Sequence, residues 1–231
     1  GHTVAMGYEA LKSQNAGAES YNVAMGYQAG LSVSTGVRNT IIGGLAGASL
    51  TTGNYNTALG YGALYTEDAH GNNTAIGYQA LVTQNAGADA YNVAVGFKAG
   101  KEVTTGIENT IIGGLAGDAL TTGAYNVAVG MEALSDEDAH GKNTAIGYRA
   151  LKVQNAGADG NNVAVGYNAG TSVSTGVYNT LVGGACGDAL TTGAYNVAMG
   201  THALSTEDTG SRNVAIGQGA LQSLNYDGNG Y

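Results

Sequence analysis

Residues 73–96 read NTAIGYQALVTQNAGADAYNVAVG, and residues 143–166 read NTAIGYRALKVQNAGADGNNVAVG, an offset of 70 positions. The two stretches share a nine-residue motif: Asn, Thr or Val, Ala, an aliphatic residue, Gly, an aromatic residue, a variable residue, Ala, and Leu or Gly. We number these motif positions one to nine. Self-similarity at a set period is typical of a repeat architecture, in which each repeat packs against its neighbours.

The motif recurs from one end of the chain to the other. Its Asn returns at steps of 19, 17, 17 and 17 residues, so four copies make a 70-residue unit. The position-one residues are Asn22, Asn39, Asn56, Asn73, Asn92, Asn109, Asn126, Asn143, Asn162, Asn179, Asn196 and Asn213, with Thr3 in the first copy. No linker or change of composition interrupts the repeat. This predicts a single repeat domain over residues 1–231, which we expect to be an excerpt of a longer fibre protein.

The residue types in each copy favour strands over helices. A glycine at position five and another in the following turn would each cost a helix about 1 kcal/mol relative to alanine. Triplets such as VAV at 93–95 are apolar, and β-branched residues alternate with a smaller one, which is typical of a short strand. We expect a second short strand around the Tyr-x-Ala-Leu segment, then a turn such as TTG at 51–53.

Two short strands and two turns per copy predict an all-β fold, a parallel β-solenoid of about thirteen coils of 17–19 residues. Coils that stack about 4.8 Å apart would give a rod of roughly 60 Å. The two additional residues of each 19-residue step are expected in a longer loop at the NAGA segments. The motif asparagines should stack along the rod with their side-chain amides hydrogen-bonded to one another.

Positions three and six vary together. Ten copies carry Ala at position three, and seven of those carry Tyr or Phe at position six. The other three copies carry Ile41, Ile111 or Leu181 at position three and glycine at position six. Because a packed interior conserves volume, this exchange predicts that the two positions touch across the glycine at position five.

The composition excludes several classes of function. Among 231 residues, Lys and Arg number 8 and Asp and Glu number 17, a net charge of −9. Nucleic-acid binding requires a basic surface, so we expect no nucleic-acid partner. No apolar run approaches the roughly 18 residues that span a bilayer, so we expect no membrane insertion. The one cysteine, Cys186, replaces an alanine of other copies and is expected to be a small buried residue.

The apolar residues also bear on assembly. Each strand triplet is apolar on both faces, as in Val23, Ala24 and Met25. The core candidates are mostly Ala, Val and Gly, which bury little area for the backbone that they order. A lone rod would leave one face in water, so we expect a parallel homotrimer, either intertwined or side by side.

Residues 56–81, NTALGYGALYTEDAHGNNTAIGYQAL, resemble the repeats of phage tail-fibre proteins. They also resemble the heads of trimeric autotransporter adhesins, and the likeness extends from Thr3 to about Leu221. The resemblance implies a left-handed parallel β-roll that trimerises. It further implies an extracellular location, on a virion tail fibre or a bacterial cell surface, and a structural or adhesive role in attachment to a host or surface.

The acidic segments are the candidate metal sites. TEDAHG at 66–71 and DEDAHG at 136–141 combine carboxylates with a histidine, whereas TEDTGS at 206–211 has no histidine. No stretch has the spacing of a calcium loop or a zinc motif. We therefore favour solvated acidic loops and predict neither a bound metal nor a cofactor. The candidate ligands are Glu67, Asp68, His70, Glu137, Asp138 and His140.

A set of tyrosines just before the motif Asn is the candidate ligand-facing surface. Amphipathic rings in a row can bind a glycan or a protein of a host surface, although a stacked ladder that covers a turn is the favoured interpretation. The set comprises Tyr21, Tyr55, Tyr91, Tyr125, Tyr178 and Tyr195.

The sequence gives catalysis no support. The glycines follow the repeat period and do not form the strand–G-x-G-x-x-G–helix arrangement of a dinucleotide site. We therefore predict that the chain is not an enzyme. The alternative to a fibre module is a solenoid whose repeats bind a ligand. A glycan is the favoured ligand, and ice or a cation is less favoured.

Overall fold

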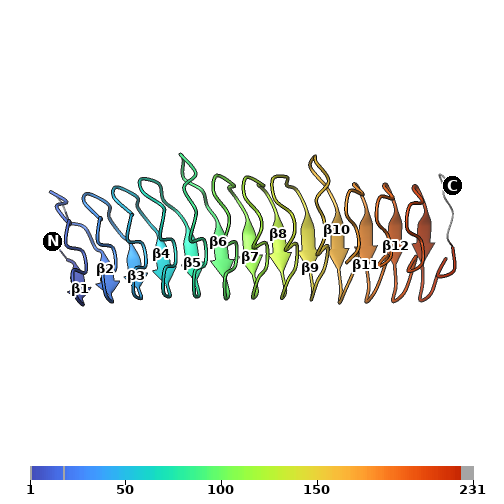
Figure 1. Cartoon of the computed structure of the whole chain (residues 1–231), viewed down its shortest axis with the longest axis horizontal. Helices are drawn as coiled ribbons and strands as arrows, with labels where there is room; N and C mark the ends of the chain where they lie inside the picture. The colour runs from blue at the N-terminus through green and yellow to red at the C-terminus, as the bar shows by residue number, and fades with distance from the viewer. Residues whose placement is uncertain (1, 18, 225–231) are drawn as a thin grey trace.

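The computed structural model describes residues 2–17 and 19–224, and every regular element within them is a strand. Thirteen three-residue strands form one parallel sheet in sequence order, so the chain is an all-β parallel solenoid (Figure 1). The strands are β1 Val4–Met6, β2 Val23–Met25, β3 Thr40–Ile42, β4 Thr57–Leu59, β5 Thr74–Ile76, β6 Val93–Val95, β7 Thr110–Ile112, β8 Val127–Val129, β9 Thr144–Ile146, β10 Val163–Val165, β11 Thr180–Val182, β12 Val197–Met199 and β13 Val214–Ile216.

The register follows the motif. Each strand residue pairs with the residue at the same motif position in the next copy, as Ala94 does with Ile111 and Val95 with Ile112. The middle residue of each strand from β2 to β13 is buried, and the residues on either side of it point outward. The predicted β-solenoid is thus confirmed. The loops that project furthest follow β5 and β9, where the NAGA segments lie (Figure 1).

The predicted second strand is wrong. After position five the chain forms turns, and the residues at positions seven and nine have a left-handed backbone, with φ of 54° at Gln79 and 48° at Leu81. An extended strand requires φ near −120°. The coils still bond to one another there, because the Gln79 N–H donates to the Tyr61 carbonyl at 2.9 Å and the Leu81 N–H to the Ala99 carbonyl at 3.1 Å.

Position five admits only glycine. Gly113 has φ of +137°, and a Cβ added there would lie 2.4 Å from the carbonyl oxygen of Gly130. The corresponding glycines of the neighbouring copies approach one another as closely. The turn that ends each strand therefore depends on a row of glycines stacked backbone to backbone.

The core is filled by positions three, eight and nine, together with a Val or Leu three residues after each position-nine glycine, as in Val103 and Leu120. Ile111 is fully buried, and its Cδ1 would lie 2.9 Å from a Cβ at Gly100 and 3.5 Å from one at Gly117. Both glycines occupy position nine, where other copies carry a buried leucine such as Leu134. A large residue at position three thus helps to fill the space that glycine leaves at position nine, both in its own copy and in the copy before.

The predicted contact between positions three and six is wrong. Phe97 at position six is 52% exposed, while Ala94 of the same copy is fully buried. A Cβ added at Gly114 would meet nothing within 4 Å. The two positions lie on opposite sides of the coil wall, because the chain turns outward after the glycine at position five.

The asparagines of position one stack as predicted, but most of their bonds go to the backbone. The Asn126 N–H donates to Asn109 Oδ1 at 2.9 Å, and Asn109 Nδ2 donates to the Gly123 carbonyl at 2.9 Å. An amide–amide bond joins Asn196 Nδ2 to Asn179 Oδ1 at 3.1 Å. The buried amides of successive copies therefore satisfy main-chain groups that the turns leave unpaired, although Nδ2 of Asn73 and of Asn143 has no partner.

Cys186 is buried, as expected, and burial raises the pKa of its thiol to about 11. Within the described residues, no helix has the length and apolar character needed to cross a membrane.

Candidate functional site

One side of the sheet is uncharged and at least partly exposed along the whole rod. The residues at motif positions two and four point outward from the strands, and all of them are Val, Thr, Ile, Leu or Met. Ile112 and Ile146 are each 38% exposed, and Met199 is 42% exposed. We call these two rows the outer sheet face. It carries no charged side chain on any of the thirteen strands.

A row of aromatic rings runs along the edge where the strands end. Its members at position six, the outer aromatic row, are Tyr8, Tyr27, Tyr61, Tyr78, Phe97, Tyr148 and Tyr167. Neighbouring rings stack, with centroids 5.5 Å apart for Tyr78 and Phe97 and 5.3 Å apart for Tyr148 and Tyr167.

The joint variation of positions three and six predicts these rings in the interior, whereas they lie outside. The signal that would have found them outside is the variety at position six, which also accepts Met131, Thr201 and Gln218. A closely packed interior would not accept side chains that differ so much in size and polarity.

A hollow of about 280 Å³ lies beside Tyr61 of the outer aromatic row, where the first repeat unit meets the second. It is lined by Leu45, Tyr61, Gly62, Tyr65, Gln79 and Val82. Gly62 and Tyr65 stand where the second unit has Glu132 and Ser135. The hollow thus arises where the repeat loses one long side chain and gains an aromatic ring.

The tyrosines before the motif Asn are about half exposed, from 45% at Tyr21 to 57% at Tyr91. Tyr178 and Tyr195 occupy successive copies and stack at 5.1 Å. Other copies carry charged residues at this place, and Arg38 lies over the ring of Tyr55 at 5.3 Å. The structure therefore brings two of the six rings together and interleaves the others with polar and charged side chains.

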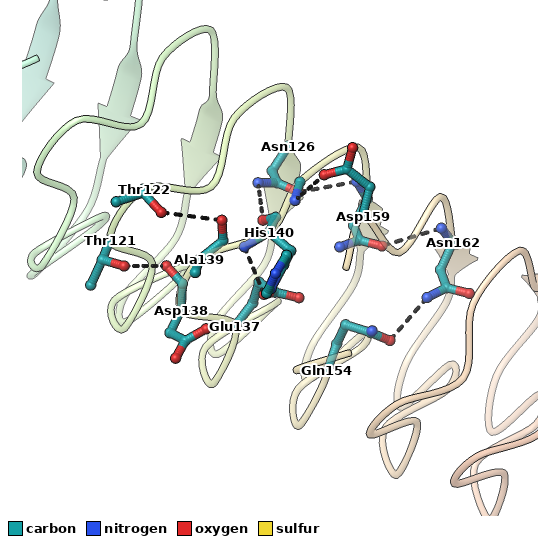
Figure 2. A network of polar contacts seen from close by, with 12 residues as sticks. Thr121, Thr122, Asn126, Glu137, Asp138, Ala139, His140, Gln154, Asp159 and Asn162 are labelled. Atoms are coloured by element: carbon teal, nitrogen blue, oxygen red, sulfur yellow. Dashed lines mark hydrogen bonds and ion pairs between the residues drawn. The ribbon is translucent and has the colours of Figure 1, made fainter. Parts of the chain in front are cut away.

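The two His-containing acidic segments form compact clusters. In the first, Glu67 is fully buried, Asp68 is exposed and His70 is partly buried, and one ligand atom from each lies within 4.8 Å of the other two. His70 Nδ1 lies 3.5 Å from Glu67 Oε1. Glu137, Asp138 and His140 repeat the arrangement, with 3.6 Å between His140 Nδ1 and Glu137 Oε1 (Figure 2).

The clusters differ from the favoured interpretation of solvated acidic loops. The Asp side chains are exposed and the His side chains are 28% exposed, but the Glu carboxylates are enclosed by the coil. Burial raises the pKa of Glu67 and of Glu137 above the usual range, against the smaller opposing effects of the neighbouring His backbone N–H and imidazole. The sequence shows that the three residues are neighbours, but it does not show that the glutamate points inward.

The rows of the solenoid hold each cluster in place. In the second cluster, Thr121 Oγ1 donates to the Asp138 carbonyl at 2.6 Å and Thr122 Oγ1 to the Ala139 carbonyl at 3.2 Å (Figure 2). Asn126 Nδ2 donates to the His140 carbonyl at 3.3 Å. The preceding coil therefore anchors the backbone of three successive residues of the cluster.

Charged side chains on the outside form a second polar group. Glu132 Oε2 lies 2.8 Å from both Lys152 Nζ and Arg149 Nε. The bonds from Lys152 and Arg149 lower the pKa of the Glu132 carboxyl. This group lies on the surface, so we assign it no more than a modest electrostatic contribution.

The comparisons with known proteins add no assignment to this geometry. No family model, no curated protein and no solved structure matches the chain.

Proposed function

We propose that this chain is a structural and adhesive module of an extracellular fibre, either a phage tail fibre or a bacterial surface adhesin. In this proposal it assembles as a parallel homotrimer with coils of 17–19 residues, takes part in attachment to a host or surface, and catalyses no reaction. The observation that carries the proposal is the outer sheet face, which is uncharged along all thirteen strands and apolar at every position four.

An exposed apolar stripe of this length favours association. Soluble monomers seldom leave large contiguous apolar patches in water. A rotationally symmetric assembly buries the same stripe of every chain and closes on itself, so no copy of the interface is left exposed. Parallel chains would keep the motif rows in register, and the net charge of −9 per chain would keep the assembled rod soluble.

The assembly is tested by mass. Light scattering at low micromolar concentration should give about three times 23.0 kDa. Ile112→Asp combined with Ile146→Asp places charges on the outer sheet face and should shift the mass to that of one chain. The matched control, Ala158→Asp, adds its charge on an exposed loop and should leave the trimer intact. A folded wild-type monomer, or a double variant that still trimerises, would contradict the proposal.

A second candidate function is glycan binding, and the outer aromatic row favours it. The stacked rings are about half exposed and present apolar ring edges beside hydroxyl groups, which suits contact with the apolar face of a sugar ring. A glycan array of several sugar classes distinguishes the two functions. Saturable binding of one class, lost on Tyr78→Ala, would favour binding by the repeats. Absence of binding across the array would leave the chain as a spacer in the fibre.

A further inference from the structure

We propose that each Glu–Asp–His cluster binds one divalent transition-metal ion of the Zn²⁺ type, so that the chain holds two ions 70 residues apart. In the first site the ligands are a carboxylate oxygen of Glu67, Nδ1 of His70 and a carboxylate oxygen of Asp68. In the second they are the same atoms of Glu137, His140 and Asp138. This inference is independent of the proposed fibre function.

The first argument is the polar atoms that the fold buries without a partner. Glu67 Oε2 and His70 Nδ1 are both enclosed and have no hydrogen bond, and the same holds for Glu137 Oε2 and His140 Nδ1. Leaving a buried polar group unpaired costs about 1–3 kcal/mol, and more for a charged one. A bound cation would satisfy both atoms of each pair at once.

The second argument is distance. The 3.5 Å between His70 Nδ1 and Glu67 Oε1 is too long for a good hydrogen bond. Two ligands that each lie about 2.0–2.1 Å from a tetrahedral zinc ion are separated by about 3.3 Å. Small side-chain rotations would therefore bring the imidazole and the carboxylate into one coordination shell. The exposed Asp68 can swing in as the third ligand, which leaves a fourth position for water.

The choice of ion follows from the ligands. Calcium and magnesium prefer shells of oxygen atoms alone. An imidazole nitrogen beside carboxylates suits Zn²⁺, and to a related extent Ni²⁺, Co²⁺ and Cu²⁺. Three protein ligands with an accessible fourth position resemble the open type of zinc site.

The two sites differ in two charged neighbours, because the second has Asp136 and Lys142 where the first has Thr66 and Asn72. Gly71 N donates to Asp89 Oδ1 at 2.8 Å in the first site, and Gly141 N donates to Asp159 Oδ1 at 3.1 Å in the second. Lys142 pairs with that second aspartate at 2.7 Å, whereas the first site has Asn72 in its place. The two charges that the second site adds are opposite in sign, so we expect the two sites to bind the ion with similar affinity.

The third repeat unit provides an internal control. Its segment has Gly210 where the other units have His70 and His140, and the Gly210 N–H donates to Glu207 Oε1 at 2.6 Å. The carboxylate is present there but the nitrogen ligand is absent. We therefore expect no binding by the third segment.

Calorimetric titration of the metal-free, untagged chain with ZnCl₂ tests the proposal. The wild type should bind two ions per chain, and His70→Ala combined with His140→Ala should bind none. His202→Ala, which removes an exposed histidine outside both clusters, should still bind two. Co²⁺ should give a visible absorption spectrum in the wild type and none in the double variant, and excess Ca²⁺ or Mg²⁺ should not displace it.

Gain of function is the complementary test. Gly210→His should raise the stoichiometry to three ions. A Cβ there would lie 2.6 Å from the Glu207 carboxylate, so that flexible side chain must turn aside, as Glu67 and Glu137 lie beside their histidines. Two results would overturn the proposal. One is the absence of saturable binding in the folded wild type. The other is undiminished binding in the double variant, which would assign the ions to surface groups such as His2 and His202.

Discussion

Gly113 and Gly114 are neighbours in the sequence, yet the structure constrains them in opposite ways. A Cβ on Gly113 would strike the backbone of the next coil at 2.4 Å, whereas one on Gly114 would meet nothing within 4 Å. The first glycine belongs to the stacked turn, and the second is a gap in the outer aromatic row. Identical residues in a repeat therefore reveal little about constraint until the direction of the chain after the strand is known.

The same contrast extends to whole rows. Positions three and nine face inward and exchange volume with one another, as Ile111 does with the gaps at Gly100 and Gly117. Position six faces outward and accepts rings, Met131, Thr201 or glycine. The interior rows should therefore respond sharply to substitution and the exterior rows weakly. Unfolding of the variants and the wild type should be measured at equal protein concentration, because assembly contributes to stability.

The largest effect is expected from Gly113→Ala. The new methyl group would force both a change of φ from +137° and a separation of the coils. Backbone strain and overpacking together should cost about 3–5 kcal/mol, measured as a shift of the urea midpoint. Gly114→Ala is the matched control and should leave the midpoint in place. Equal midpoints for the two variants would refute the contrast.

Next in size is Ile111→Ala, which leaves a cavity beside two glycines and should cost about 2–4 kcal/mol. Gly117→Leu alone should overpack the same space and cost about 1–3 kcal/mol. The double variant recreates the combination of Ala128 with Leu134 and should recover more than half of the larger loss. A double-mutant cycle without coupling would show that positions three and nine do not share this space.

A smaller effect is expected from Glu132→Gln on the surface. Lys152 and Arg149 lower the pKa of the Glu132 carboxyl in the folded chain. Its contribution is therefore present above the ordinary value of 4.5 and lost as the pH falls through the lowered value. The melting-temperature difference between wild type and variant should be largest near neutral pH, and should shrink in acid and in high salt. A difference that grows in acid would reverse the assignment.

The smallest effect is expected from Gly114→Tyr, within about 0.5 kcal/mol of the wild type. The added ring has open space and continues the row beyond Phe97. This outcome is the reverse of the one implied by a contact between positions three and six. A loss comparable to that of Gly117→Leu would place position six in the interior after all.

The register and the strand positions could be predicted because repeats of one sequence pair most simply with themselves. The absence of a second strand could not be predicted. It depends on the left-handed backbones of Gln79 and Leu81, and neither residue type is typical of a positive φ. The neighbours Glu67, Asp68 and His70 were visible as a cluster. The burial of Glu67 was not visible, because it depends on how the coil closes around the side chain.

The matched register has a consequence for the length of the rod. Every copy pairs position for position with the next, and the pattern of Leu, Gly and Ile in the core repeats only after 70 residues. Recombination that adds or removes one such unit would keep every row continuous and change the rod by about 19 Å. Loss of a single copy would leave a core glycine such as Gly100 without the neighbour that fills its gap. The length of the rod can therefore vary genetically in steps of four coils, without any change in the structure of a single coil.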